Sequence, residues 1–113
     1  MSGSTPSNYA QFRILIKQGT KSGSVQPSPG GNGQLPASIR AMATASVTVE
    51  FTILAVGVDR PMIAGPTSLS PENTQIGVTE PVIVNAYTLT ATTLEPAPTD
   101  VTIEGDVSYA PPQ

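Results

Sequence analysis

The sequence contains no cysteine, no histidine and no tryptophan. Without cysteine, the chain has neither disulfides nor thiolate metal sites. Without histidine, it lacks the side chain that most often acts as a general acid or base near neutral pH. Only three tyrosines and two phenylalanines remain to build an aromatic platform for carbohydrate. We therefore expect a protein that is not an enzyme and that carries no cofactor and no catalytic metal.

Charged residues are also scarce, at 12%, and they are unevenly distributed. Residues 1–40 contain four basic residues and no acidic one, whereas residues 61–113 contain six acidic residues and no basic one. Five basic residues in all do not make the basic patch that nucleic-acid binding needs, so we expect no nucleic-acid partner. The asymmetry fits either chance or a basic segment that meets an acidic surface on the same chain or on a neighbour.

Long hydrophobic runs are absent as well. The longest, residues 53–58, has six residues, whereas a membrane span needs about 20. The N-terminal residues, MSGSTPSN, lack the apolar region of a secretory signal. We expect a protein that is made in a cytosol and does not contact a membrane.

Proline, glycine, serine, threonine and valine make up much of the chain, as is typical of an all-β domain with many turns. The strongest pattern lies in residues 41–56, AMATASVTVEFTILAV, where every odd position from Ala41 to Ala55 is apolar. This alternation predicts one long strand with one face in a core. The alternative for residues 35–45 is a short helix, because Ile39, Met42 and Ala43 have helical spacing.

Five further strands are predicted, at residues 9–17, 62–64, 74–79, 81–92 and 99–109. Residues 81–92 carry apolar side chains on both faces, which favours a central position in a sheet. Gly105 falls on the apolar face of its strand and indicates a bulge or a close backbone approach. Together the strands predict a small β-sandwich of immunoglobulin-like build, with a small barrel as the alternative.

Residues 18–36, QGTKSGSVQPSPGGNGQLP, are predicted to form one long loop. A loop of this length is unusual inside a compact domain, so the first strand belongs either to the sandwich or to an extended arm tethered by the loop. The predicted division is an N-terminal arm with the first strand and the Gly/Pro-rich loop at residues 1–36, a sandwich body at 37–109 and a Pro-rich tail at 110–113.

Three carboxylates, Asp100, Glu104 and Asp106, are the remaining candidates for chemistry. Glu104 and Asp106 share a strand face, with their Cα atoms about 7 Å apart. A weak calcium site or a glycosidase-like pair is one interpretation, but the solvent face of an amphipathic strand is the one we prefer. Pro29–Gly33 lacks the Gly-Lys-Ser/Thr ending of a phosphate-binding loop.

In its layout, a cysteine-free β domain with an N-terminal segment and the run SPGGNG at residues 28–33, the chain resembles the capsid decoration (cement) proteins of bacteriophages. The resemblance implies a non-enzymatic virion protein, assembled in the host cytoplasm, that stabilises a capsid. Its expected partners are the major capsid protein or other virion subunits and neighbouring copies of itself, as a homo-oligomer or on the capsid lattice.

The strand at residues 9–17 and its flanks are the expected contact region, through addition to the edge of a neighbouring sheet. The residues expected to contact the partner are Tyr9, Phe12, Arg13, Leu15, Lys17 and Lys21. Two other hypotheses remain open from the sequence. One is a receptor- or glycan-binding adhesion module of a tail or surface appendage, and the other is a self-assembling coat, neck or tail subunit.

Overall fold

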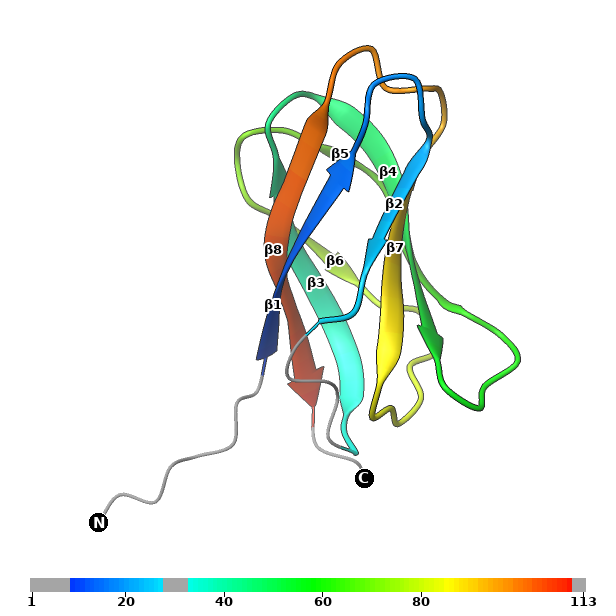
Figure 1. Cartoon of the computed structure of the whole chain (residues 1–113). Coiled ribbons are helices and arrows are strands. Elements are labelled where there is room, and N and C mark those ends of the chain that lie inside the picture. Colours follow the sequence, from blue (N-terminus) through cyan, green and yellow to red (C-terminus); the bar gives the residue numbers. More distant parts are fainter. Residues whose placement is uncertain (1–8, 28–32, 111–113) are drawn as a thin grey trace.

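The structure is a computed structural model that describes residues 9–27 and 33–110 (Figure 1). These residues form eight strands and no helix. The strands are β1 (Tyr9–Ile16), β2 (Ser22–Val25), β3 (Leu35–Ala43), β4 (Val47–Ala55), β5 (Met62–Leu69), β6 (Thr74–Gly77), β7 (Tyr87–Thr93) and β8 (Val101–Ala110). This described part of the chain contains no helix that could cross a membrane.

The strands form two antiparallel sheets of four, in the orders β1-β8-β3-β6 and β2-β7-β4-β5. Figure 1 shows the two sheets stacked as a sandwich. The predicted β-sandwich is therefore confirmed. Pairing joins β1 to β8, β2 to β7, β3 to β6 and β4 to β5. This nested pairing of eight strands in two sheets is the jelly-roll arrangement.

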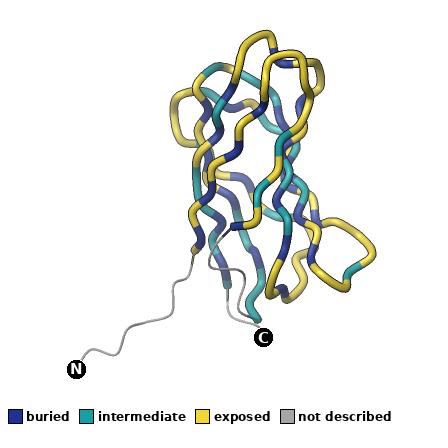
Figure 2. Tube along the Cα trace, viewed as in Figure 1, coloured by how far each residue is buried: buried dark blue, intermediate teal, exposed yellow. Residues whose placement is uncertain are grey.

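The core fills the space between the sheets, and buried and exposed residues alternate along most strands (Figure 2). Phe12 of β1 and Phe51 of β4 meet across this space edge to face, with ring centroids 6.0 Å apart. Burial of such apolar side chains is the main term that favours folding. The largest fully buried side chains are Phe51, Ile14, Ile16, Ile39, Ile53, Leu69, Leu89, Ile103, Val49, Val84, Val101 and Val107.

The prediction of one long strand over residues 41–56 is wrong, and so is the helical alternative for residues 35–45. The chain forms β3 in one sheet, crosses at residues 44–46 and forms β4 in the other. Ala43 is buried before the crossing and Val49 after it. Because the two sheets face the same core, the alternation keeps its phase through the crossing, and the pattern alone cannot reveal it.

The predicted structureless loop at residues 18–36 is also corrected. It contains β2, which pairs with β7, and Leu35 already belongs to β3. The strand at residues 9–17 is confirmed as β1, and it pairs with β8 along its whole length. The sandwich body therefore begins at Tyr9 rather than at residue 37. Residues 1–8, 28–32 and 111–113, which include most of the SPGGNG run and the predicted tail, lie outside the described residues.

Two other strands differ by several residues from their predicted bounds. The short edge strand predicted at residues 62–64 is β5, which continues through Pro66 to Leu69 and lies at the edge of its sheet. Proline has no backbone N–H to donate to a neighbouring strand, so it is tolerated at the edge of a sheet, where one side has no such neighbour. The strand predicted at residues 81–92 begins only at Tyr87. Its predicted central position is confirmed, because β7 lies between β2 and β4.

A buried tyrosine pair joins the two sheets. The hydroxyl groups of Tyr87 on β7 and Tyr109 on β8 form a hydrogen bond, and their rings pack edge to face with centroids 6.4 Å apart. Burial, together with the hydrogen bond and the charge of Tyr109, raises the pKa of Tyr87 far above its usual value. Burial also raises the pKa of Tyr109, although the hydrogen bond from Tyr87 partly opposes this. The protein interior therefore favours the neutral pair.

Candidate functional site

The outer surface of the β1-β8-β3-β6 sheet is polar, and we call it the four-strand face. Because β8 pairs with β1 on one side and with β3 on the other, residues of these three strands lie side by side in rows across the face. One row contains Arg13, Glu104 and Met42, and the next contains Gln11, Asp106 and Arg40. The outward-facing residues of the face are Tyr9, Gln11, Arg13, Leu15, Ser38, Arg40, Met42, Gln75, Thr102, Glu104, Asp106 and Ser108.

Three adjoining hollows follow β8 along this face. The upper hollow, of about 150 Å³, is bounded on β8 by Thr102 and Glu104. The middle hollow, of about 490 Å³, extends from Glu104 to Asp106. The lower hollow, of about 250 Å³, extends from Asp106 to Ser108. Each hollow shares one β8 side chain with the next, so the three hollows lie in a row along β8, and we call this row the groove.

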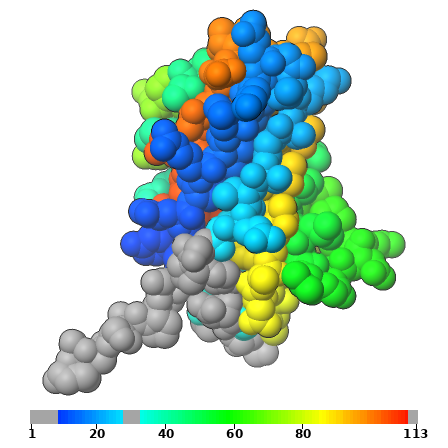
Figure 3. All heavy atoms as spheres, viewed as in Figure 1, coloured from blue at the N-terminus to red at the C-terminus, as the bar shows by residue number. Residues whose placement is uncertain are grey.

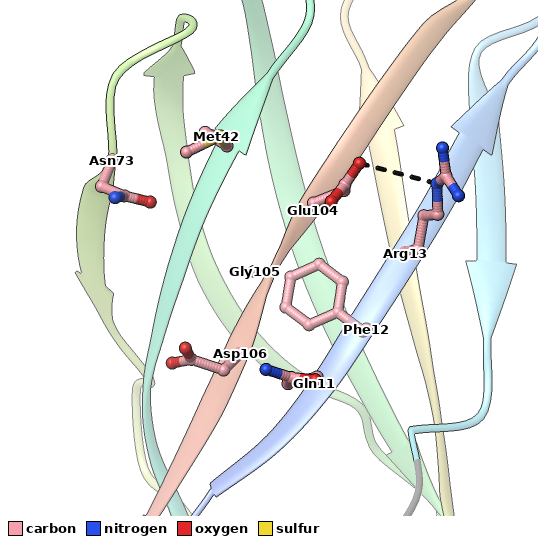
Figure 4. A pocket seen from close by; sticks show the side chains of 8 residues that line it. All are labelled: Gln11, Phe12, Arg13, Met42, Asn73, Glu104, Gly105 and Asp106. Carbon is pink, nitrogen blue, oxygen red and sulfur yellow. Dashed lines mark ion pairs between the residues drawn. The ribbon is translucent and has the colours of Figure 1, made fainter.

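Polar side chains from all four strands reach the middle and lower hollows. Figure 4 shows the middle hollow, with Gln11 and Arg13 on β1, Glu104 and Asp106 on β8, Met42 on β3 and Asn73 just before β6. The lower hollow is lined by Tyr9, Gln11, Arg40, Gln75, Asp106 and Ser108. Gln11 and Asp106 therefore line both hollows and stand at their junction.

Gly105 shapes the middle hollow. A β-carbon added there would run into the carbonyl oxygen of Arg40 and would lie 2.8 Å from the Cα of Ala41. The predicted close backbone approach at Gly105 is thus confirmed, and the neighbour is β3. The backbone of Gly105 and the largely buried ring of Phe12 line the hollow between Glu104 and Asp106.

Two cross-strand ion pairs balance the charge of the groove. Arg40 Nη2 lies 3.0 Å from Asp106 Oδ2, and the Asp106 side chain is only 15% exposed. Arg13 Nε lies 3.6 Å from Glu104 Oε1, and both of these side chains are largely exposed. An exposed pair of this kind contributes little to stability, about 0–1 kcal/mol. The second pair is therefore open to rearrangement around a ligand.

The structure does not gather the three predicted carboxylates into one site. Asp100 lies before β8 and accepts a hydrogen bond from the Gln18 backbone N–H at 2.8 Å. Glu104 forms an ion pair with Arg13, and Asp106 forms an ion pair with Arg40. Among residues 9–27 and 33–110, no three acidic, histidine or cysteine side chains are placed to hold a metal ion. The interpretation as the solvent face of an amphipathic strand fits these positions.

The predicted contact residues on β1 have different surroundings. Tyr9, Arg13 and Leu15 point outward on the four-strand face, and Lys17 and Lys21 are exposed in the connection to β2. The inclusion of Phe12 is wrong, because its ring is 6% exposed and packs against Phe51 in the core. It faces inward since it occupies the same side of β1 as Ile14 and Ile16.

The free edge of β1 is partly covered, which bears on the predicted addition to a neighbouring sheet. A β-carbon on Gly23 of β2 would run into the carbonyl oxygen of Leu15 and would lie 2.8 Å from the Ile14 side chain. The backbones of β1 and β2 therefore approach closely at this point. A strand added to β1 would have to displace β2 there.

Sequence reasoning missed several residues of the groove. The apolar pattern of residues 41–56 indicates inward positions only, so it does not single out the outward Met42 or the preceding Arg40. Gln11, Asn73 and Gln75 carry no motif of their own, and only the sheet order brings them beside β8. The one usable signal was the outward position of Arg40 and Met42, which flank the buried Ala41.

A second surface feature lies at the other side of the sandwich, where the connections after β4 and before β7 meet. We call it the apolar end, and its exposed residues are Leu54, Val56, Ile63, Val82 and Ile83. The Val56 N–H donates to the Ala86 carbonyl at 3.2 Å, and the Val82 N–H donates to Met62 Sδ at 3.3 Å. Figure 3 shows these two connections, green and yellow, side by side at the surface.

No protein-family model and no curated protein sequence matches the chain. A solved structure described as "CBM4 structure and function" is similar with a TM-score of 0.48 and 10% identity, over 91% of this chain and 92% of the other. Another, "Carbohydrate-Binding Module CBM36 in complex with calcium and xylotriose", has a TM-score of 0.46 and 11% identity, over 96% and 91%. At this identity no binding residue carries over to the present chain.

Proposed function

We propose that this chain is a non-catalytic binding module that holds a neutral oligosaccharide along β8 on the four-strand face. The observation that carries the proposal is the row of three adjoining hollows that follows β8 from Thr102 to Ser108. At about 3.4 Å per residue the groove is about 20 Å long. This length suits a linear chain of several sugar rings better than one small molecule.

The groove side chains match the chemistry of hydroxyl groups. A sugar hydroxyl donates one hydrogen bond and accepts others, so it is satisfied best by groups that offer both functions. The amides of Gln11, Asn73 and Gln75 offer a donor and an acceptor each, while Glu104 and Asp106 supply acceptors. A site built to hydrogen-bond hydroxyls also rejects ligands that lack them, because its polar groups would be left unpaired.

The charge of the groove favours a neutral ligand. Arg13 and Arg40 are matched by Glu104 and Asp106, so the four-strand face carries two positive and two negative charges. A polyanion such as a nucleic acid would require an excess of basic residues along its path. Tyr9, which is 51% exposed, adds one stacking surface at the lower end of the groove. We therefore expect hydrogen bonds to carry most of the affinity.

The substitution Gln11→Ala tests this proposal, because Gln11 lines both the middle and the lower hollow. Loss of one or two hydrogen bonds, at about 1 kcal/mol each, lowers the affinity for the oligosaccharide about tenfold. The measurement is an NMR titration of the protein with a panel of neutral oligosaccharides. Backbone amide signals of β1, β8 and β3 should shift, and the dissociation constant should rise in the variant.

The matched control is Gln18→Ala, which removes an exposed glutamine side chain in the turn after β1, away from the groove. It should leave the affinity unchanged. If no neutral oligosaccharide shifts the signals of the four-strand face, or if both variants weaken binding equally, the proposed function is wrong.

The second candidate is the virion decoration protein, and the apolar end is the observation that favours it. Exposed apolar surface of this kind is typical of protein–protein contacts. The jelly roll hosts both viral capsid and lectin domains, so the fold does not choose between the two functions. On this second proposal, the apolar end binds a major capsid subunit.

Cosedimentation with expanded phage capsids separates the two candidates. For a decoration protein, the double variant Val56→Ser/Ile83→Ser should lose capsid binding, because two exposed apolar contacts are removed. Gln11→Ala should retain it. If the wild-type protein does not sediment with any capsid tested, the decoration role is wrong and the groove proposal is unaffected.

A further inference from the structure

The upper hollow differs from the other two because it is mainly apolar. Its lining residues are Met42, Ala43, Thr44, Pro71, Thr102 and Glu104. Met42 is 37% exposed and points outward from β3 beside Pro71 of the β5–β6 connection. Met42 and Glu104 line the middle hollow too, so the apolar hollow lies directly beside the polar middle hollow. A ligand held in the groove therefore meets an apolar recess of about 150 Å³ beside it.

This inference rests on the proposed function. We infer that the groove selects glycans that carry an N-acetylamino group. The methyl of that group would lie in the upper hollow. The proposal depends on three neighbouring side chains, Met42, Thr44 and Glu104. Each matches a different part of an acetamido substituent, which has a methyl group, an N–H donor and a carbonyl acceptor.

Glu104 provides the acceptor. Its side chain is 57% exposed, and its described partner is Arg13 Nε at 3.6 Å. Figure 4 shows Glu104 between Arg13 on one side and Met42 on the other. A carboxylate has several acceptor positions, so it can accept the acetamido N–H while it still faces Arg13. A hydrogen bond to an ionised acceptor is stronger than a neutral one.

Thr44 provides the donor. Its hydroxyl oxygen accepts a hydrogen bond from the Thr102 backbone N–H at 3.1 Å. That contact orients the hydroxyl and leaves its hydrogen available for the acetamido carbonyl. The methyl group then lies against Met42 and Pro71. Methionine suits this role because its flexible thioether adapts to irregular gaps. An O-acetyl ester would lack the N–H that donates a hydrogen bond to Glu104.

Two matched ligand pairs test the inference by NMR titration. Chitohexaose and cellohexaose differ at C2 of each ring, where an acetamido group replaces a hydroxyl, and N-acetylgalactosamine and galactose differ in the same way. We expect the acetylated member of at least one pair to bind about tenfold more tightly, because burial of the methyl and the added hydrogen bonds act together. The Met42 methyl signal should shift with the acetylated ligand.

Variants assign the preference to the upper hollow. Met42→Ser should remove most of the tenfold preference while the protein still binds the hydroxyl ligand. Met42→Leu, which stays apolar, should keep it. Leu54→Ser removes another exposed apolar side chain, on the opposite sheet, and serves as the control. It should change neither affinity.

The outcomes distinguish this inference from the proposed function on which it rests. Equal binding of the members of both pairs, or tighter binding of the hydroxyl members, overturns the acetamido preference and leaves the oligosaccharide groove standing. The inference also fails if neither pair binds while another neutral glycan does. If no neutral glycan shifts the four-strand face, both proposals fail.

Discussion

Gly105→Ala is expected to destabilise the protein by about 3 kcal/mol or more, the upper part of the range for overpacking a closely packed site. The added β-carbon would overlap the Arg40 carbonyl oxygen and lie 2.8 Å from the Ala41 Cα. Both obstacles are backbone atoms of β3, which cannot rotate away as a side chain can. The two strands must separate, and the β3–β8 pairing holds the centre of the sheet together.

Urea unfolding followed by circular dichroism measures this loss. The control is Gly77→Ala on β6, because a β-carbon there meets no atom within 4 Å. We expect the control to lie within about 0.5 kcal/mol of the wild type, as is usual for surface substitutions. A similar unfolding midpoint for the two variants would show that β3 and β8 do not approach closely at Gly105.

The second large effect is a loss of stability above about pH 10 from the buried pair of Tyr87 and Tyr109. The pKa of Tyr87 is raised in the folded protein, mainly by burial. Below the usual tyrosine pKa of about 10, both states keep the proton and the stabilisation is fully present. Above it, the unfolded chain releases the proton while folded Tyr87 retains it. Stability therefore falls by about 1.4 kcal/mol per pH unit for this residue.

Urea midpoints measured between pH 8 and 11.5 test the pH dependence. Tyr87→Phe should flatten the alkaline decline relative to the wild type, because the group that titrates only on unfolding has been removed. Tyr9→Phe serves as the control, since the Tyr9 ring is half exposed on the four-strand face. If Tyr87→Phe and the wild type decline in parallel, Tyr87 does not keep its proton preferentially in the folded state.

The tyrosine pair makes a further contribution near neutral pH. Tyr109→Phe removes the hydroxyl group that forms a hydrogen bond with Tyr87. Tyr87 is only 2% exposed, so water cannot replace the lost partner. We expect a loss of about 1–3 kcal/mol, the usual cost of a buried polar group that loses its partner. The same urea experiment at pH 7 measures it, and an unchanged midpoint would contradict it.

The sequence alone determined the β class, the inward side of most strands and the close backbone approach at Gly105. It could do so because these features are local: alternation with a period of two reports which side of a strand faces a core. The outward position of Glu104 and Asp106 follows from the same alternation, and the structure places both on the four-strand face.

Only the tertiary structure decided where one strand ended and another began, and which strands became neighbours. The crossing at residues 44–46 left the alternation of residues 41–56 in phase, because both sheets share one core. The groove depends on the same long-range order. Gln11, Met42 and Glu104 lie far apart in the chain, and they line one hollow because β1 and β3 both pair with β8. No local pattern encodes which strands pair over such distances, so the site could not be found before the sheet order was known.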